Sequence, residues 1–250
     1  RTDDSRQVET TAPSMSWFGT APRVAASVAG LSLLVMAVVA PLAVFGVLGS
    51  LVVSGDPATT FNNIAGSQGL FRSGVAAFLL VIMLDVVVAW ALFVLLRSVN
   101  PRVALLTAWL RVVFAAVFAA ALVNLLEAAE LVAGSGGSGL SPDQLHAQVM
   151  SLISAFDLGW TGIALAIFGL HLFGLGYLLY KSMDFPKFLG VLVAVAGGGY
   201  LFDSLGVILV ADYVATVATF TFVGEALLIF WLGWRALKGF PSDGELAPSA

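Results

Sequence analysis

Long apolar segments alternate with short polar segments along the chain, and this alternation predicts membrane-spanning helices. A run of about 20 apolar residues crosses the hydrocarbon core of a bilayer, and six segments reach that length: about residues 23–53, 70–96, 103–133, 145–180, 186–210 and 213–237. We therefore predict an all-α, polytopic membrane protein with a six-helix transmembrane domain at 23–238. Polar tails at 1–22 and 239–250 are predicted to flank it.

Turn and cap signals refine these boundaries. Pro41 lies inside the first apolar segment and predicts a kink there. The segment 54–69 is rich in turn-forming residues and is predicted to be a loop. Ser141-Pro142-Asp143-Gln144 has the pattern of a capping box at a helix start. The helix that follows is too long for one straight span, so its first turns are expected outside the membrane or at the interface.

Composition excludes a water-soluble fold. Hydrophobic residues make up 60% of the chain and charged residues only 10%, whereas soluble domains carry about 25% charged residues. The absence of cysteine excludes disulfides, thiol catalysis and cysteine-ligated metals. The lipid bilayer is thus the one partner that composition requires, and no nucleic-acid partner is expected.

The basic residues indicate an orientation. Nine of the 11 basic residues fall on the side of the termini if six helices cross the membrane, and only Arg72 falls in a loop on the opposite side. Cytoplasmic loops carry an excess of Lys and Arg, so both termini are predicted to be cytoplasmic. The nine residues are Arg1, Arg6, Arg23, Arg97, Arg102, Lys181, Lys187, Arg235 and Lys238.

Ionisable residues inside the apolar segments are the candidate site. Charged side chains in a bilayer are costly, and they face the bundle interior where they find partners. At about 1.5 Å per helical residue, counting from the basic turns places four of them in one layer near the midplane: Asp85, Arg111, His171 and Glu225. Asp203 falls in the outer third beside Tyr200, and Asp157 near the outer boundary. These seven residues are the predicted cavity or binding positions.

Two interpretations of this layer remain open. It could form a polar cavity for a cationic or proton-coupled substrate. Alternatively, Arg111 could pair with Asp85 or Glu225 to fix helix register, with His171 as a hydrogen-bonded core residue. A metal site built from His171, Asp203 and Glu225 would be unusual. The sequence identifies no catalytic residue, cofactor or metal ligand.

Three stretches resemble a family of uncharacterised bacterial membrane proteins, domain of unknown function 4386. They are F-G-L-H-L-F-G-L-G-Y-L-L-Y-K-S (168–182), A-G-G-G-Y-L-F-D-S (196–204) and G-E-A-L-L-I-F-W-L-G-W-R-A-L-K-G-F (224–240). The resemblance implies six helices and a bacterial inner membrane. It implies no activity, and the positions it marks here are His171, Asp203 and Glu225.

Three functional hypotheses follow. The first is a binding or transport module for a small molecule or ion, with a polar cavity at the midplane. The second is an accessory or structural subunit of a larger membrane complex, with membrane-protein partners or further copies of itself. The third and least favoured is an intramembrane enzyme that uses His171 and Asp203 as acid and base.

Overall fold

The computed structural model describes residues 22–137 and 139–238, and the regular elements among these residues are all helices. Six helical segments are long and apolar enough to cross a membrane, which confirms the fold class predicted from the hydrophobic pattern. They are Val24–Leu51, Gln68–Leu96, Pro101–Ala133, Pro142–Lys181, Lys187–Leu209 and Val217–Arg235. The predicted tails at 1–22 and 239–250 lie outside the described residues except for Pro22, where α1 begins.

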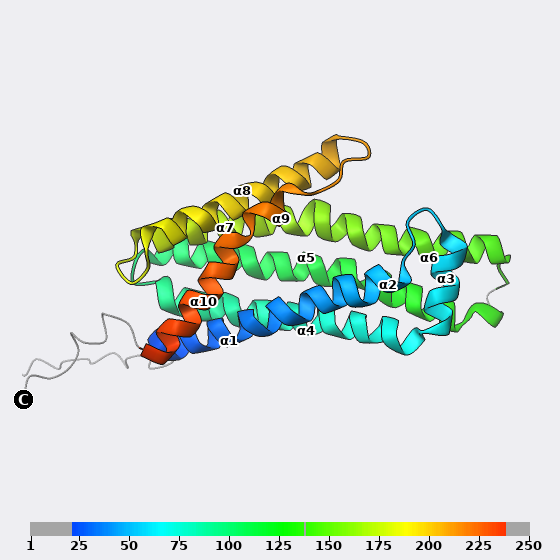
Figure 1. Cartoon of the computed structure of the whole chain (residues 1–250), viewed down its shortest axis with the longest axis horizontal. Helices are drawn as coiled ribbons and strands as arrows, with labels where there is room; N and C mark the ends of the chain where they lie inside the picture. The colour runs from blue at the N-terminus through cyan, green and yellow to red at the C-terminus, as the bar shows by residue number, and fades with distance from the viewer. Residues whose placement is uncertain (1–21, 138, 239–250) are drawn as a thin grey trace, which may run out of the picture.

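The six spans form a closed ring in which each packs against the next (Figure 1). The order is α1 (Pro22–Pro41), α4 (Gln68–Leu96), α5 (Pro101–Ala133), α7 (Leu165–Lys181), α8 (Lys187–Leu209) and α10 (Val223–Lys238). α10 contacts both α8 and α1 and so closes the ring. It crosses the bundle obliquely between these two helices (Figure 1).

α1 and α10 run antiparallel, and the backbone at Gly30 lies against Leu232 and Gly233. The start of α1 and the end of α10 therefore lie at the same end of the bundle, together with the α4–α5 and α7–α8 turns (Figure 1). The basic residues of those two turns gather at this end, as the charge pattern predicts. That this end faces the cytoplasm stays a prediction.

Local capping fixes several helix starts. The capping box at Ser141 and Gln144 begins α6 (Pro142–Asp157), as predicted. The predicted loop at 54–69 is wrong in one respect, because it contains a short helix, α3 (Pro57–Gly66). Asp56 caps that helix by accepting hydrogen bonds from the Thr59 amide at 2.9 Å and the Thr59 hydroxyl at 2.7 Å. The hydrogen bond from the Thr59 amide is the main reason that the pKa of the Asp56 carboxyl lies below its usual range.

Three spans depart from regular α-helix. The first passes into a π-helix, η2 (Leu42–Leu48), directly after Pro41, where the sequence predicts a kink. The fourth passes through a second π-helix, η4 (Leu158–Ala164), between α6 and α7. The sixth begins at Val217 rather than 213, and it is divided into α9 (Val217–Thr221) and α10. π-helical turns are frequent at functional sites.

Glycines allow α7 and α8 to pack with their backbones in contact. A Cβ at Gly176 would lie 2.6 Å from the Gly190 carbonyl oxygen, and a Cβ at Gly197 would lie 2.6 Å from the Gly169 carbonyl oxygen. Small residues at helix interfaces permit this approach in membranes. α8 continues as a helix through Gly197–Gly199, and two of these glycines serve close packing: Gly197 against α7 and Gly199 against Thr221 of α9.

We expect Gly176→Ala to lower the stability of the bundle by about 2 kcal/mol, because the added methyl group meets backbone that cannot move aside. The thermal midpoint in detergent micelles measures this. Gly46→Ala is the matched control, since a Cβ there has nothing within 4 Å. Equal midpoints for the two variants would contradict backbone contact between α7 and α8.

Candidate functional site

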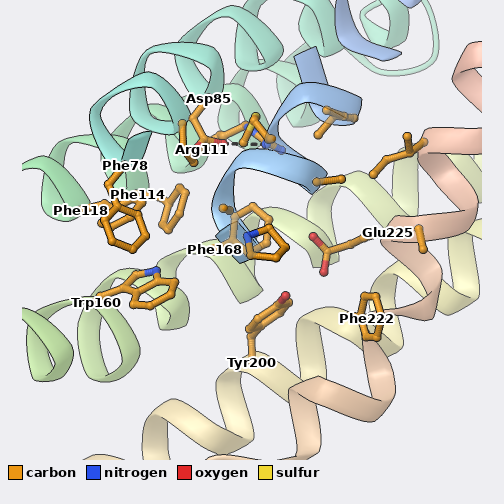
Figure 2. A pocket seen from close by; sticks show the side chains of 18 residues that line it. Phe78, Asp85, Arg111, Phe114, Phe118, Trp160, Phe168, Tyr200, Phe222 and Glu225 are labelled. Atoms are coloured by element: carbon orange, nitrogen blue, oxygen red, sulfur yellow. Dashed lines mark ion pairs between the residues drawn. The ribbon is translucent and has the colours of Figure 1, made fainter. Parts of the chain in front are cut away.

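A partly open cavity of about 330 Å³ lies between the spans, and residues of all six line it. Figure 2 shows the side chains of its wall. Most of the lining is aliphatic or aromatic. The polar side chains on the wall are those of Asp85, Arg111, Tyr200 and Glu225, together with the indole of Trp160. The remaining lining residues are Leu33, Met36, Ala37, Ala40, Pro41, Phe78, Val81, Phe114, Phe118, Phe168, Phe222, Ala226 and Ile229.

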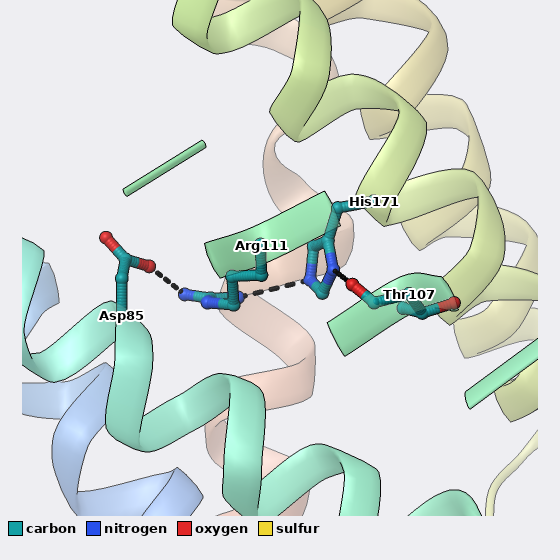
Figure 3. A network of polar contacts seen from close by, with 4 residues as sticks. All are labelled: Asp85, Thr107, Arg111 and His171. Carbon is teal, nitrogen blue, oxygen red and sulfur yellow. Dashed lines mark hydrogen bonds and ion pairs between the residues drawn. The ribbon is translucent and has the colours of Figure 1, made fainter. Parts of the chain in front are cut away.

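Arg111 and Asp85 form a buried ion pair on one side of the cavity. The Arg111 Nη2 atom lies 2.6 Å from Asp85 Oδ1, and both side chains are 3% exposed or less (Figure 3). Of the two pairings that the sequence left open, the structure thus has Arg111 with Asp85. The guanidinium carbon also lies 5.4 Å from the centre of the Phe168 ring, which adds a cation–π contact.

His171 binds the Arg111 guanidinium but does not itself line the cavity. Its Nδ1 atom lies 2.8 Å from the Thr107 carbonyl oxygen, and its Nε2 atom lies 3.2 Å from Arg111 Nη1 (Figure 3). A carbonyl oxygen only accepts, so Nδ1 carries the proton and Nε2 accepts from the guanidinium. Both nitrogens of this fully buried ring are therefore used, and the predicted place of His171 on the cavity wall is corrected to a supporting place.

Glu225 and Tyr200 lie across the cavity from the ion pair. Their carboxylate and hydroxyl groups point toward each other (Figure 2) and interact electrostatically. The Glu225 Oε1 atom is buried and has no hydrogen-bond partner among the described residues. Glu225 lies in the first turn of α10, three residues after Phe222, which separates α9 from α10.

Asp203 is separate from the cavity and joins α8 to the chain that follows it. Its Oδ1 atom accepts from the Tyr213 hydroxyl at 2.7 Å and from the Thr216 and Val217 amides at 3.2 Å. Its Oδ2 atom accepts from the Ala218 amide at 2.7 Å. Asp203 thus caps α9, a structural role, and its hydrogen bond raises the pKa of the Tyr213 phenol.

Asp157 is also outside the central cavity. It is exposed, and it lines a second depression of about 450 Å³ between η2 and the α6–η4 segment, at the end of the bundle opposite the basic turns. Trp160 lines both spaces and lies between them. Its indole stacks on Phe118, with ring centres 5.5 Å apart and planes at 10°.

Asp85, Arg111 and Glu225, which the sequence places in one layer, thus line one cavity. Tyr200 joins them, although the sequence places it in the outer third beside Asp203, and the sequence analysis does not identify the aromatic wall. Phe114 follows Arg111 by three residues and Phe118 follows it by seven, the repeat of one helix face. Phe78 precedes Asp85 by seven residues and shares its face in the same way. This helical spacing from the charged residues is the sequence signal that could have identified the aromatic wall. The Thr107 carbonyl that binds His171 has no signal in the sequence.

This arrangement defines a class: a multi-pass α-helical membrane protein whose spans line a mostly apolar cavity with buried charges. The chain belongs to the family described as Domain of unknown function (DUF4386), whose model matches residues 28–235. The match confirms the family resemblance of the sequence.

A relative in the archaeon Archaeoglobus fulgidus, named "Uncharacterized protein", is 35% identical over 164 residues. The aligned region covers 66% of this chain and 84% of the relative. This relative is archaeal, and a bacterial inner membrane as the location of this chain stays a prediction. No solved structure matches the chain.

Proposed function

We propose that this chain is a binding or transport module for small molecules and that the cavity inside the helix ring is its binding site. The observation that carries the proposal is the space that protein side chains leave at the level of the buried charges. Its volume of about 330 Å³ lies within the range of small-molecule pockets, about 300–1,000 Å³. Apolar walls with a few convergent polar groups are typical of such pockets.

Packing considerations support a role beyond assembly. Protein interiors are close-packed, and the side chains that line a space of this size forgo van der Waals contacts across it. Glu225 adds a second cost, because a buried carboxyl oxygen without a hydrogen-bond partner is unfavourable. A bundle serving only as a structural subunit gains nothing from either feature.

The third hypothesis, an acid–base enzyme, has little support in the geometry. His171 uses both ring nitrogens on Thr107 and Arg111, and Asp203 accepts four hydrogen bonds from the segment before and within α9. Neither side chain lines the cavity. A proton-transfer pair needs free groups within reach of one substrate.

Cysteine accessibility tests the proposal, since the sequence holds no cysteine. Ala40 lines the cavity from α1, whereas Ala116 is exposed on the outer surface of α5, where lipid is expected. We expect Ala40→Cys, in liposomes, to react with water-soluble methanethiosulfonates about tenfold faster than Ala116→Cys or more. The reason is that only a hydrated thiol ionises to the reactive thiolate.

The two cysteine variants carry the same chemical change, so a difference in rate reports on their surroundings. Circular dichroism and the thermal midpoint verify that both fold. An unreactive Ala40→Cys in a folded protein would show a closed, dry interior and would contradict a binding cavity.

A further inference from the structure

The charges facing the cavity do not balance. Asp85 and Arg111 neutralise each other at 2.6 Å, and His171 is held as a neutral acceptor behind them. No ion pair among the described residues includes Glu225. An ionised Glu225 would therefore leave one negative charge in an apolar space, where an unpaired charge is costly.

Arg111 is the only cationic side chain among the described residues that line the cavity, and it forms no ion pair with Glu225. α1 contributes only aliphatic side chains and Met36 to the lining, and α7 contributes Phe168. α8 contributes Tyr200, which points its hydroxyl at the carboxylate. The guanidinium of α5 is bound to α4 through Asp85. An ionised Glu225 is therefore complemented best by a positive group that comes with the ligand.

The aromatic rings near Glu225 favour the same sign of charge. Phe168, Tyr200 and Phe222 surround the carboxylate in the cavity (Figure 2). The face of an aromatic ring attracts cations, and substituted ammonium groups are bound by such rings in many proteins. Arg111 over Phe168 is an example within this site.

We propose that the cavity binds an organic cation, an ammonium group with an apolar body, with its positive group against Glu225 and its body among the aromatic side chains. This inference rests on the proposed function and names its ligand class. An anion would face an unpaired carboxylate and an arginine already neutralised by Asp85. A neutral hydrocarbon would leave Glu225 Oε1 without a partner. A bare metal ion needs several oxygen ligands, and this wall is mostly apolar.

The first test compares two reagents of opposite charge on Ala40→Cys in liposomes. Trimethylammonioethyl methanethiosulfonate is a cation, and sulfonatoethyl methanethiosulfonate is an anion. After each rate is divided by that for a free thiol in solution, we expect the cation to react about tenfold faster, because a cavity with one sign of charge concentrates the opposite ion. Glu225→Gln in the same background should reduce that ratio to near one.

Glu127→Gln is the matched control for the charge, since Glu127 is exposed on α5 and does not line the cavity. It should leave the ratio unchanged. Equal normalised rates for cation and anion would overturn the organic-cation inference and leave the binding cavity standing. If neither reagent reacts, the binding cavity itself is contradicted.

A second measurement needs no change at Glu225. Benzyltrimethylammonium and neopentylbenzene have nearly the same shape and differ by one charge. We expect the ammonium compound to protect Ala40→Cys from modification at about one tenth of the concentration that the hydrocarbon requires. Equal protection by the two compounds, or better protection by the hydrocarbon, would overturn the inference.

Discussion

Replacing Arg111 with methionine is expected to destabilise the bundle by about 3–5 kcal/mol. The substitution leaves Asp85 buried, at 1% exposure, without its positive partner. It also removes the donor to His171 Nε2. Leaving a buried charge uncompensated costs more than the ion pair contributed, because neither partner was hydrated in the folded state. Reversible unfolding in mixed micelles, followed by far-ultraviolet circular dichroism, measures the loss.

The double variant Asp85→Leu/Arg111→Met separates this explanation from simple loss of packing. With both charges gone, most of the stability should return, to within about 1–2 kcal/mol of the unsubstituted chain. Additive effects of the two single substitutions would contradict an energetic coupling between these side chains. The remaining deficit would reflect His171, which still lacks a donor for Nε2.

This pair also shows how far sequence reasoning reaches. Depth along a helix follows from residue counts, and it correctly placed Asp85, Arg111 and Glu225 in one layer. It could not choose between the two carboxylates for Arg111, since the choice depends on how each helix is rotated about its axis. Asp85 lies on α4, which packs directly against α5, whereas Glu225 lies on α10, whose ring neighbours are α8 and α1.

Asp203 shows the opposite case. Hydropathy counts every residue of an apolar run as part of a span, so it extended the last helix back to residue 213. The chain instead forms a loop before Val217, and that loop brings three amides and the Tyr213 hydroxyl to Asp203. A carboxylate that binds backbone amides cannot be told from a cavity residue by its position in the sequence, because the path of the loop decides.

Asp203→Ala is expected to cost about 3 kcal/mol and to release the segment between α8 and α10. Four hydrogen bonds to one carboxylate are lost. A single charge-assisted hydrogen bond of this kind contributes about 1.5–3 kcal/mol, but the contributions of four bonds to one acceptor group do not add up. Hydrogen exchange should report the change locally, as faster exchange of the Thr216, Val217 and Ala218 amides. The matched variant Tyr213→Phe removes only one of the four hydrogen bonds and should lower the stability much less than Asp203→Ala does.

The Tyr213 phenol supplies an independent readout. Its pKa is raised because its hydroxyl donates a hydrogen bond to Asp203, so this hydrogen bond stabilises the fold below the ordinary phenol pKa of about 10. The stabilisation is lost as pH rises through the raised value. In Asp203→Ala the tyrosine should titrate at lower pH, seen in the ultraviolet absorbance of phenolate. Unchanged titration and unchanged amide exchange would contradict the capping role.

Since the same segment leads into α10, which carries Glu225, a loosened cap should also reduce the preference of the cavity for the cationic reagent.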